Sequence, residues 1–186
     1  MADTAKQEHA CRVLTVGHST RPIEDFLALL AEHGIEALAD VRRFPASRKH
    51  PQFNAENLRA SLAGAGIEYV PMTELGGRRP ARKDSRNTAW RNASFRGYAD
   101  YMETPPFEKS FEKLLLKAQT RRTAIMCAES LWWRCHRSLI SDALKARGCE
   151  VCHIAHPGAC EEHPYTAAAS IVDGKLSYGS RQAEAF

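Results

Sequence analysis

The chain has 186 residues, of which 44% are hydrophobic and 26% charged, and its formal net charge is +4 at pH 7. This length and composition predict one globular domain and exclude a mainly disordered chain. No apolar run approaches the roughly 20 residues of a membrane span, and the polar start MADTAKQEHA lacks the apolar centre of a signal peptide. We therefore expect a cytoplasmic protein without a membrane partner. Its six cysteines are then expected to be free thiols, metal ligands or catalytic groups rather than a disulfide framework.

Short apolar runs, rich in β-branched residues and closed by glycine or polar residues, alternate with segments of helical periodicity. The predicted strands are residues 12–17, 36–41, 67–71, 123–127 and 150–154. The predicted helices are residues 21–34, 54–66, 105–119 and a last one that ends at Gly148; the segment 95–102 precedes the third of them. Near the end of the chain, IVDGKLSY has an Asp-Gly pair between two short apolar runs, which predicts a β-hairpin.

This alternation predicts an α/β fold in which a mostly parallel sheet is covered by helices on both faces. We expect a single three-layer domain at residues 11–180, with about five strands and the C-terminal hairpin. Residues 1–10 are expected to form a disordered N-terminal tail.

A basic segment lies between Pro71 and Arg96, where seven Arg or Lys residues face two acidic ones. Trp90 and Phe95 are interleaved with these cations. Cations together with aromatic rings can hold a phosphate or a stacked base. A solvated loop is the structural alternative.

Unusual polar chemistry follows each predicted strand. In an open parallel sheet, ligands bind just beyond the carboxyl ends of the strands, so these groups are expected to lie along one edge. They are Gly17-His18-Ser19, Asp40 with Arg42 and Arg43, Cys127 with Glu129, and His153 with His156. The structural alternatives are a helix cap at His18-Ser19, an Asp40–Arg42 ion pair, a turn at Gly76-Gly77 and a core position for Tyr98.

The stretch IMCAESLWWRCHRS places a thiol, Cys127, where a strand leads into a helix. Backbone N–H groups and the helix dipole lower a thiol pKa at such a junction, and Arg134 and Arg137 act in the same direction. The same junction binds anions, so Glu129 needs a task of its own there. It is expected to be a general acid or base, or a nucleophile toward a sugar carbon. Alternatively, Glu129 pairs with Arg134 or Arg137 and only shapes the loop.

The motifs GHST, DVRRFP, ELGG, FRGYADYM, MCAE, CHR and HPYT, in this order, closely resemble the domain-of-unknown-function 488 family from about Val13 to Ser177. The resemblance implies a single compact α/β domain of prokaryotic type and assigns no reaction. The residues that match the family motifs are Gly17, His18, Ser19, Asp40, Arg42, Pro45, Gly76, Gly77, Tyr98, Tyr101, Cys127, Glu129, Cys135, His136 and Arg137.

A weaker, fold-level likeness is to rhodanese-like sulfurtransferases and their phosphatase relatives. ALADVRRFP is similar to the strand end of that fold that carries an acid and an arginine, and AIMCAES to its cysteine strand. The likeness implies that Cys127 forms a persulfide. The loop after Cys127 differs from the short cradle of that fold, because it is longer and carries Glu129 and two tryptophans.

A zinc site is a further alternative, since Cys152, His156, Cys160 and His163 are donors that zinc accepts. Their spacing is not that of a standard zinc motif, so ordinary buried thiols are preferred and no cofactor is expected.

The resulting hypothesis is an enzyme that acts on an anionic small molecule or nucleic acid at the carboxyl edge of the sheet. Cys127, Glu129 and His136 are the expected catalytic residues. The expected substrate-binding residues are Gly17, His18, Ser19, Asp40, Arg42, Gly76, Gly77, Tyr98, Arg134, Cys135 and Arg137. The alternatives are a sulfurtransferase or phosphatase that uses Cys127, and a non-catalytic module that senses a nucleotide.

Overall fold

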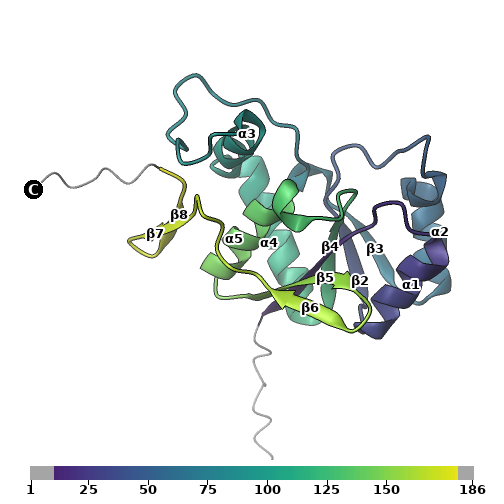
Figure 1. Ribbon diagram of the computed structural model, residues 1–186. Coiled ribbons are helices and arrows are strands. Elements are labelled where there is room, and N and C mark those ends of the chain that lie inside the picture. Colours follow the sequence, from purple (N-terminus) through teal and green to yellow (C-terminus); the bar gives the residue numbers. More distant parts are fainter. Residues whose placement is uncertain (1–10, 180–186) are drawn as a thin grey trace, which may run out of the picture.

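The computed structural model describes residues 11–179, so the expected N-terminal tail at residues 1–10 lies outside the described residues. A six-stranded sheet in the order β3-β2-β4-β1-β5-β6 runs through the molecule (Figure 1). Strands β1 to β5 pair in parallel, and β6 is antiparallel to β5. The strands are β1 (Arg12–Gly17), β2 (Ala37–Asp40), β3 (Glu68–Pro71), β4 (Thr123–Cys127), β5 (Glu150–His156) and β6 (Ala159–Glu162).

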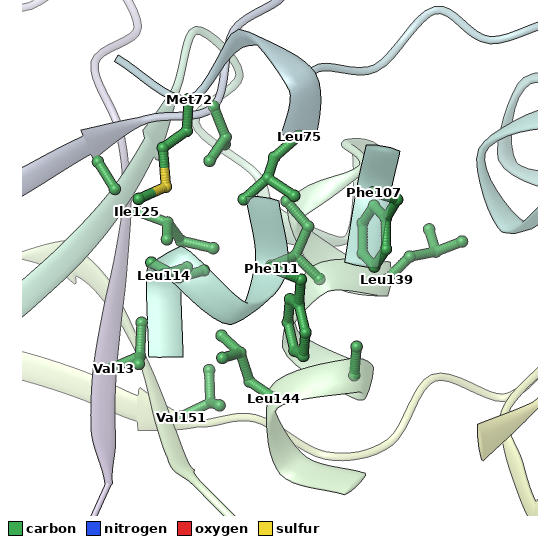
Figure 2. Close-up of a cluster of buried hydrophobic side chains, with 14 of the residues drawn as sticks. Val13, Met72, Leu75, Phe107, Phe111, Leu114, Ile125, Leu139, Leu144 and Val151 are labelled. Carbon is green, nitrogen blue, oxygen red and sulfur yellow. The ribbon is translucent and has the colours of Figure 1, made fainter. Parts of the chain in front are cut away.

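Helices cover both faces of the sheet (Figure 1). They are α1 (Ile23–Glu32), α2 (Ala55–Gly64), α3 (Ala93–Met102), α4 (Pro105–Thr120) and α5 (Arg137–Ala146). One buried cluster joins α1 and α2 to the sheet, and another joins α3, α4 and α5 to the opposite face. In the second cluster Phe107, Phe111 and Leu114 of α4 and Leu139 and Leu144 of α5 pack toward β1, β4 and β5 (Figure 2).

Strands β1 and β4 have mostly apolar sequences because both of their faces are buried. Successive side chains of a strand point to opposite faces, so Val13 enters one cluster and Leu14 the other. Both central strands are buried along almost their whole length. The hairpin of β7 (Ser170–Val172) and β8 (Lys175–Ser177) turns at Asp173 and Gly174, which have φ values of 49° and 73°. The α/β class, the three layers, the mostly parallel sheet and the hairpin are thereby confirmed.

Strand β6 was not predicted, because its sequence ACEE is polar and almost wholly exposed. A short edge strand of this kind has no apolar alternation by which it can be recognised. None of the helices within residues 11–179 is long and apolar enough to span a membrane.

The expectation that the cysteines are free thiols is wrong for four of the six. Cys11 is bonded to Cys149, and Cys152 is bonded to Cys160. The first disulfide joins the residues that precede the neighbouring strands β1 and β5, and the second crosses the β5–β6 pair. The sequence did not reveal either pairing, because one depends on the strand order and the other on the unpredicted β6. Cys127 and Cys135 are the free thiols.

Candidate functional site

The candidate site lies where β1 and β4 end side by side. Gly17 is opposite Cys127 in the parallel register. The helix after β1 covers one face of the sheet and the helix after β4 covers the other, so the chain diverges at this point and leaves a crevice. A Cβ atom at Gly17 would lie 1.9 Å from the carbonyl oxygen of Glu129. The glycine of GHST therefore serves the close approach of the two strand ends.

Two thiols form the floor of the crevice. The Sγ atoms of Cys127 and Cys135 are 2.8 Å apart and hydrogen-bonded. Cys127 ends β4, whereas Cys135 directly precedes the first turns of α5. Arg137 binds both sulfurs, since its backbone N–H lies 3.4 Å from Cys135 Sγ and its Nε lies 3.0 Å from Cys127 Sγ. The predicted junction of thiol and helix N-terminus is thus occupied by Cys135, while Cys127 lies behind it.

The two thiols differ in protonation. Burial raises the pKa of Cys127, and so does the adjacent charge on Cys135 to which Cys127 donates its proton. Burial would also raise the pKa of Cys135, but the hydrogen bond from Cys127, the neighbouring His136 and the charge of Arg137 outweigh it and bring that pKa well below its usual value. One negative charge on the pair is therefore stabilised and a second is opposed.

His136 completes a thiol–imidazole pair with Cys135. Its Nε2 lies 2.8 Å from the carbonyl oxygen of Val41, and its Nδ1 lies 3.6 Å from Cys135 Sγ. A carbonyl can only accept, so Nε2 carries hydrogen, and Nδ1 is the ring nitrogen that faces the thiol. A Cβ atom at Gly77 would lie 3.0 Å from Nδ1, so the second glycine of ELGG leaves room for the ring. Tyr98 packs beside the same ring at a centroid distance of 5.2 Å.

A cavity of about 450 Å³ opens above the thiols. Three exposed arginines, Arg43, Arg78 and Arg134, contribute to its lining, as do the aromatic rings of Phe44 and Phe95. Of the sequence-predicted residues, the cavity brings together Arg42, Gly77, Tyr98, Cys127, Glu129, Arg134, Cys135 and His136. Arg43, Phe44, Ala46, Arg78, Ser94, Phe95 and Ala128 complete the lining. Of these, Arg43 and Phe44 belong to DVRRFP, and Arg78 and Phe95 to the basic segment, so sequence signals existed for them.

Asp40 and Arg42 lie in the wall as a buried ion pair. The Nε and Nη2 atoms of Arg42 donate to the Asp40 carboxylate at 2.8 and 2.6 Å, and Tyr69 donates to the same carboxylate. Arg42 also donates to the carbonyl oxygen of Phe53 and to Nε2 of His18. The contacts therefore show a structural ion pair between Asp40 and Arg42. The neighbouring Arg43 is exposed and contributes to the lining of the cavity.

The remaining predicted residues support the site from behind. His18 is buried against the Phe53 ring at a centroid distance of 4.1 Å, and its Nδ1 donates to the carbonyl oxygen of Ser19. Burial, with the charge of Arg42, lowers the pKa of His18 to about 4, so its ring is neutral near pH 7. A Cβ atom at Gly76 would lie 2.5 Å from the backbone of Arg43, so this glycine serves a close approach of two loops rather than of a ligand.

Arg137 is directed inward and Glu129 outward. The guanidinium of Arg137, whose residue is 1% exposed, donates to Thr15 Oγ1 and to the carbonyl oxygens of Glu129 and Ser130. Its contacts are thus made below the sulfurs and not in the cavity. Glu129 is exposed, and its carboxylate accepts from the backbone N–H of Leu131 and the hydroxyl of Ser130. It does not pair with Arg137 through its side chain.

A buried chain of hydrogen bonds leads away from Arg137. Thr15 Oγ1 lies 2.7 Å from His153 Nδ1, His153 Nε2 lies 2.9 Å from His163 Nδ1, and His163 Nε2 lies 2.9 Å from Asp142 Oδ1. Arg137 can only donate and the Asp142 carboxylate only accept, so every donor in the chain points toward Asp142. Burial lowers the pKa of His153 to about 3, which keeps this ring neutral. The histidine of HPYT thus belongs to the support of the cysteine pair.

The donors of the zinc alternative do not gather. Cys152 and Cys160 are bonded to each other, His163 lies between His153 and Asp142, and His156 is exposed near the edge of the sheet. Within residues 11–179, no three His, Cys, Asp or Glu side chains are grouped so as to hold a metal ion.

Comparison with known proteins adds one match. A family model described as "Domain of unknown function DUF488" matches residues 22–144, which is more than half of the chain. Searches of curated proteins and of solved structures gave no match. The matched range includes the cysteine pair, His136, the Asp40–Arg42 ion pair and the whole cavity lining. The chain belongs to the DUF488 family, as the order of its motifs indicated.

Proposed function

We propose that the protein is an enzyme that uses Cys135 as a nucleophile, with His136 as its base, on an anionic, nucleotide-like substrate. The observation that carries this proposal is the contact of a thiol that lines the cavity with an imidazole that the Val41 carbonyl orients. A nucleophile, a base within reach and a third group that orients the base are the parts of a covalent-catalysis site. The rhodanese likeness implied Cys127 as the nucleophile, and the glycosidic hypothesis gave Glu129 as nucleophile or base. We favour Cys135, because its Sγ is next to the imidazole of His136 and it is the more exposed of the two thiols, at 7% against 2%.

The reaction steps follow from these contacts. His136 Nδ1 takes the thiol proton, and the Cys135 thiolate is stabilised by the N–H of Arg137 and by the proton that Cys127 shares with it. The thiolate attacks an electrophilic centre of the substrate and displaces a leaving group, which takes the proton from His136. Water or a second substrate then releases the group bound to sulfur, and the thiolate is regenerated.

The lining of the cavity supports the substrate class. Arg43, Arg78 and Arg134 bring positive charge to its mouth, and Phe44 and Phe95 offer ring faces for a base or another flat group. The volume of about 450 Å³ lies in the range of small-molecule sites. Phosphate on the arginines and a base on the rings would leave the remaining part of the ligand above Cys135.

Alkylation and ligand binding test the two halves of this proposal. Iodoacetamide should modify Cys135 first, at a rate that His136→Gln lowers several-fold at pH 7. Inorganic phosphate and AMP should raise the Tm, and Arg134→Ala should weaken this effect while the exposed Arg91→Ala, placed outside the cavity, leaves it unchanged. First modification at Cys127, or no difference between the Arg134 and Arg91 variants, contradicts the proposal. Ligand binding without a reactive Cys135 would instead support the non-catalytic nucleotide-sensing module.

Glu129 gives the same cavity a second candidate chemistry, transfer or hydrolysis at a glycosidic carbon. The observation in favour is its exposed carboxylate at the cavity mouth, on the loop that follows Cys127. A carboxylate there can act as a nucleophile or as a general base toward a sugar carbon. Release of free base from a nucleoside monophosphate, abolished by Glu129→Gln but retained by Cys135→Ser, would select this chemistry over the thiol reaction.

Sulfur transfer is favoured by the adjacent thiols themselves. Thiosulfate is anionic, and attack of the Cys135 thiolate on its outer sulfur would form a persulfide and release sulfite. Cys127 is enclosed by Cys135, Arg137 and the Glu129 carbonyl, so a further sulfur atom fits Cys135 better than Cys127. A mass increase of one sulfur atom that Cys135→Ser abolishes would support this reaction, and its absence with thiosulfate would exclude that donor.

A further inference from the structure

The contact between the two free thiols allows a chemistry that does not depend on which substrate the cavity binds. Cys127 and Cys135 are eight positions apart in sequence, yet their sulfurs are in contact at 2.8 Å. A disulfide bond is about 2.05 Å long, so less than about 1 Å of further approach would join them. The remaining four cysteines are already bonded in pairs.

The two thiols are placed unequally for oxidation. Cys135 is 7% exposed and lies between the turn Trp132–Arg134 and α5, whereas Cys127 is 2% exposed at the end of a central strand. A small oxidant in the cavity therefore meets Cys135 first. Cys135 is also the thiol of the pair whose pKa is lowered, and the thiolate is the form that reacts.

Cys127 is placed to react second. It lies in contact with Cys135 and is hydrogen-bonded to it, and burial raises the pKa of this second thiol. Arg137 holds this sulfur through Nε at 3.0 Å, and the guanidinium charge stabilises the Cys127 thiolate as its proton leaves. An oxidised Cys135 would thus find a second thiol next to it without any rearrangement of the sheet.

We propose that Cys127 and Cys135 form a two-electron redox site that small hydroperoxides oxidise to an internal disulfide, with Cys135 as the attacking and Cys127 as the resolving thiol. In the first step the Cys135 thiolate attacks the peroxide, the O–O bond breaks, and Cys135 becomes a sulfenic acid while the released alkoxide or hydroxide takes up a proton. In the second step Cys127 attacks the sulfenic sulfur, the S–S bond forms, and hydroxide leaves with the Cys127 proton as water. Two equivalents of an external thiol then reduce this disulfide to the two cysteines and are themselves oxidised to a disulfide.

The consequence is a reversible block of the nucleophile assigned above. The proposal rests on the reactivity of Cys135 but not on the identity of the substrate. A disulfide between the floor residues would remove the thiolate from the cavity and protect Cys135 from irreversible oxidation.

Hydrogen peroxide, added in stoichiometric amounts to the full chain, tests the proposal. We expect the loss of two hydrogen atoms in the intact mass and a peptide in which Cys127 and Cys135 are linked, both reversed by dithiothreitol. In Cys127→Ser the sulfenic acid at Cys135 should persist and be trapped by dimedone. In Cys135→Ser the thiol of Cys127 should stay reduced under the same conditions.

The outcomes separate this proposal from the proposed function. Rapid alkylation of Cys135 together with sulfinic acid, and no linked peptide, would overturn the redox pair and leave the nucleophile intact. Failure of alkylation and oxidation alike would overturn both. Oxidation of Cys127 in Cys135→Ser at the wild-type rate would overturn the assigned order. If Cys127→Ser does not fold, Cys127→Ala is the second variant that lacks the resolving thiol.

Discussion

The Nε2 atom of His163 lies 2.9 Å from Oδ1 of Asp142, and neither side chain is exposed to solvent. The same carboxylate accepts from the backbone and hydroxyl of Thr166 and from the hydroxyl of Tyr178. One carboxylate of α5 therefore holds the HPYT motif and the end of the described chain in place. It also ends the hydrogen-bond chain that begins at Arg137.

Asp142→Ala should be strongly destabilising, because it leaves several buried donors without an acceptor. We expect a loss of about 3 kcal/mol or more in the free energy of unfolding, measured in urea. Ser141→Ala is the matched control on the same helix, since Ser141 Oγ is buried and has no hydrogen-bond partner among the described residues. It should change stability by less than about 0.5 kcal/mol, or increase it. Equal effects of the two substitutions would contradict the role given to Asp142.

The buried histidines predict a loss of stability in mild acid. The pKa values of His153, about 3, and His18, about 4, lie below the value of about 6.5 in an unfolded chain. The unfolded state therefore binds more protons, and this part of the stability is complete above pH 6.5 and is lost as pH falls toward 4 and 3. Between pH 7 and 5 each ring should contribute a decrease of up to about 2 kcal/mol.

Urea unfolding at several pH values checks this expectation through the slope of stability against pH. His18→Gln should flatten the slope whatever its effect on stability at pH 7. His156→Gln, at an exposed position, should leave the slope unchanged. A slope that is the same in all three proteins would show that His18 is not buried as a neutral ring.

Gly77→Ala should impair the thiol without unfolding the protein. The added methyl group would lie 3.0 Å from His136 Nδ1 and 3.2 Å from its Cγ, so the ring must move relative to Cys135. We expect alkylation of Cys135 at pH 7 to slow several-fold. Gly64→Ala is the control, because nothing lies within 4 Å of a Cβ atom there. It should leave alkylation unchanged and stabilise α2 by up to about 1 kcal/mol.

The adjacent arginines of DVRRFP should give opposite phenotypes. Arg42→Ala leaves the buried carboxylate of Asp40 without its cation and should cost about 3–5 kcal/mol of stability. Arg43→Ala removes an exposed side chain from the cavity mouth, so stability should change by less than about 1 kcal/mol while AMP binding weakens. Denaturant unfolding and a thermal-shift titration measure the two effects. Loss of AMP binding in a stable Arg42→Ala protein would reverse these roles.

The sequence predicted the sheet, its helices and the convergence of the strand ends, because each of these follows from local periodicity. It also identified DVRRFP, ELGG and CHR as parts of one site. Periodicity does not specify which way a side chain points after a strand ends. Arg137 was therefore expected to face a substrate and lies below the sulfurs, and the front position was assigned to Cys127 rather than Cys135.

Other features depend on contacts between distant segments. The chain from Thr15 through His153 and His163 to Asp142 joins β1, β5, the segment after β6 and α5, and no short motif spans these positions. His153 was expected, with His156, among the polar groups beyond the end of a strand, but it lies buried within β5. Its role becomes visible only when the strand order places β5 beside β1.

The chain of hydrogen bonds from Arg137 to Asp142 also shows which segments of the protein have to fold together. The family match ends at residue 144, and it begins after β1. Thr15, His153 and His163 lie outside that range, as do two neighbouring strands at the centre of the sheet. A protein shortened to residues 22–144 would retain every side chain of the cavity lining but lose the partners of Arg137 and Asp142. Truncation studies should therefore keep Thr15, His153 and His163 within the piece that is expressed.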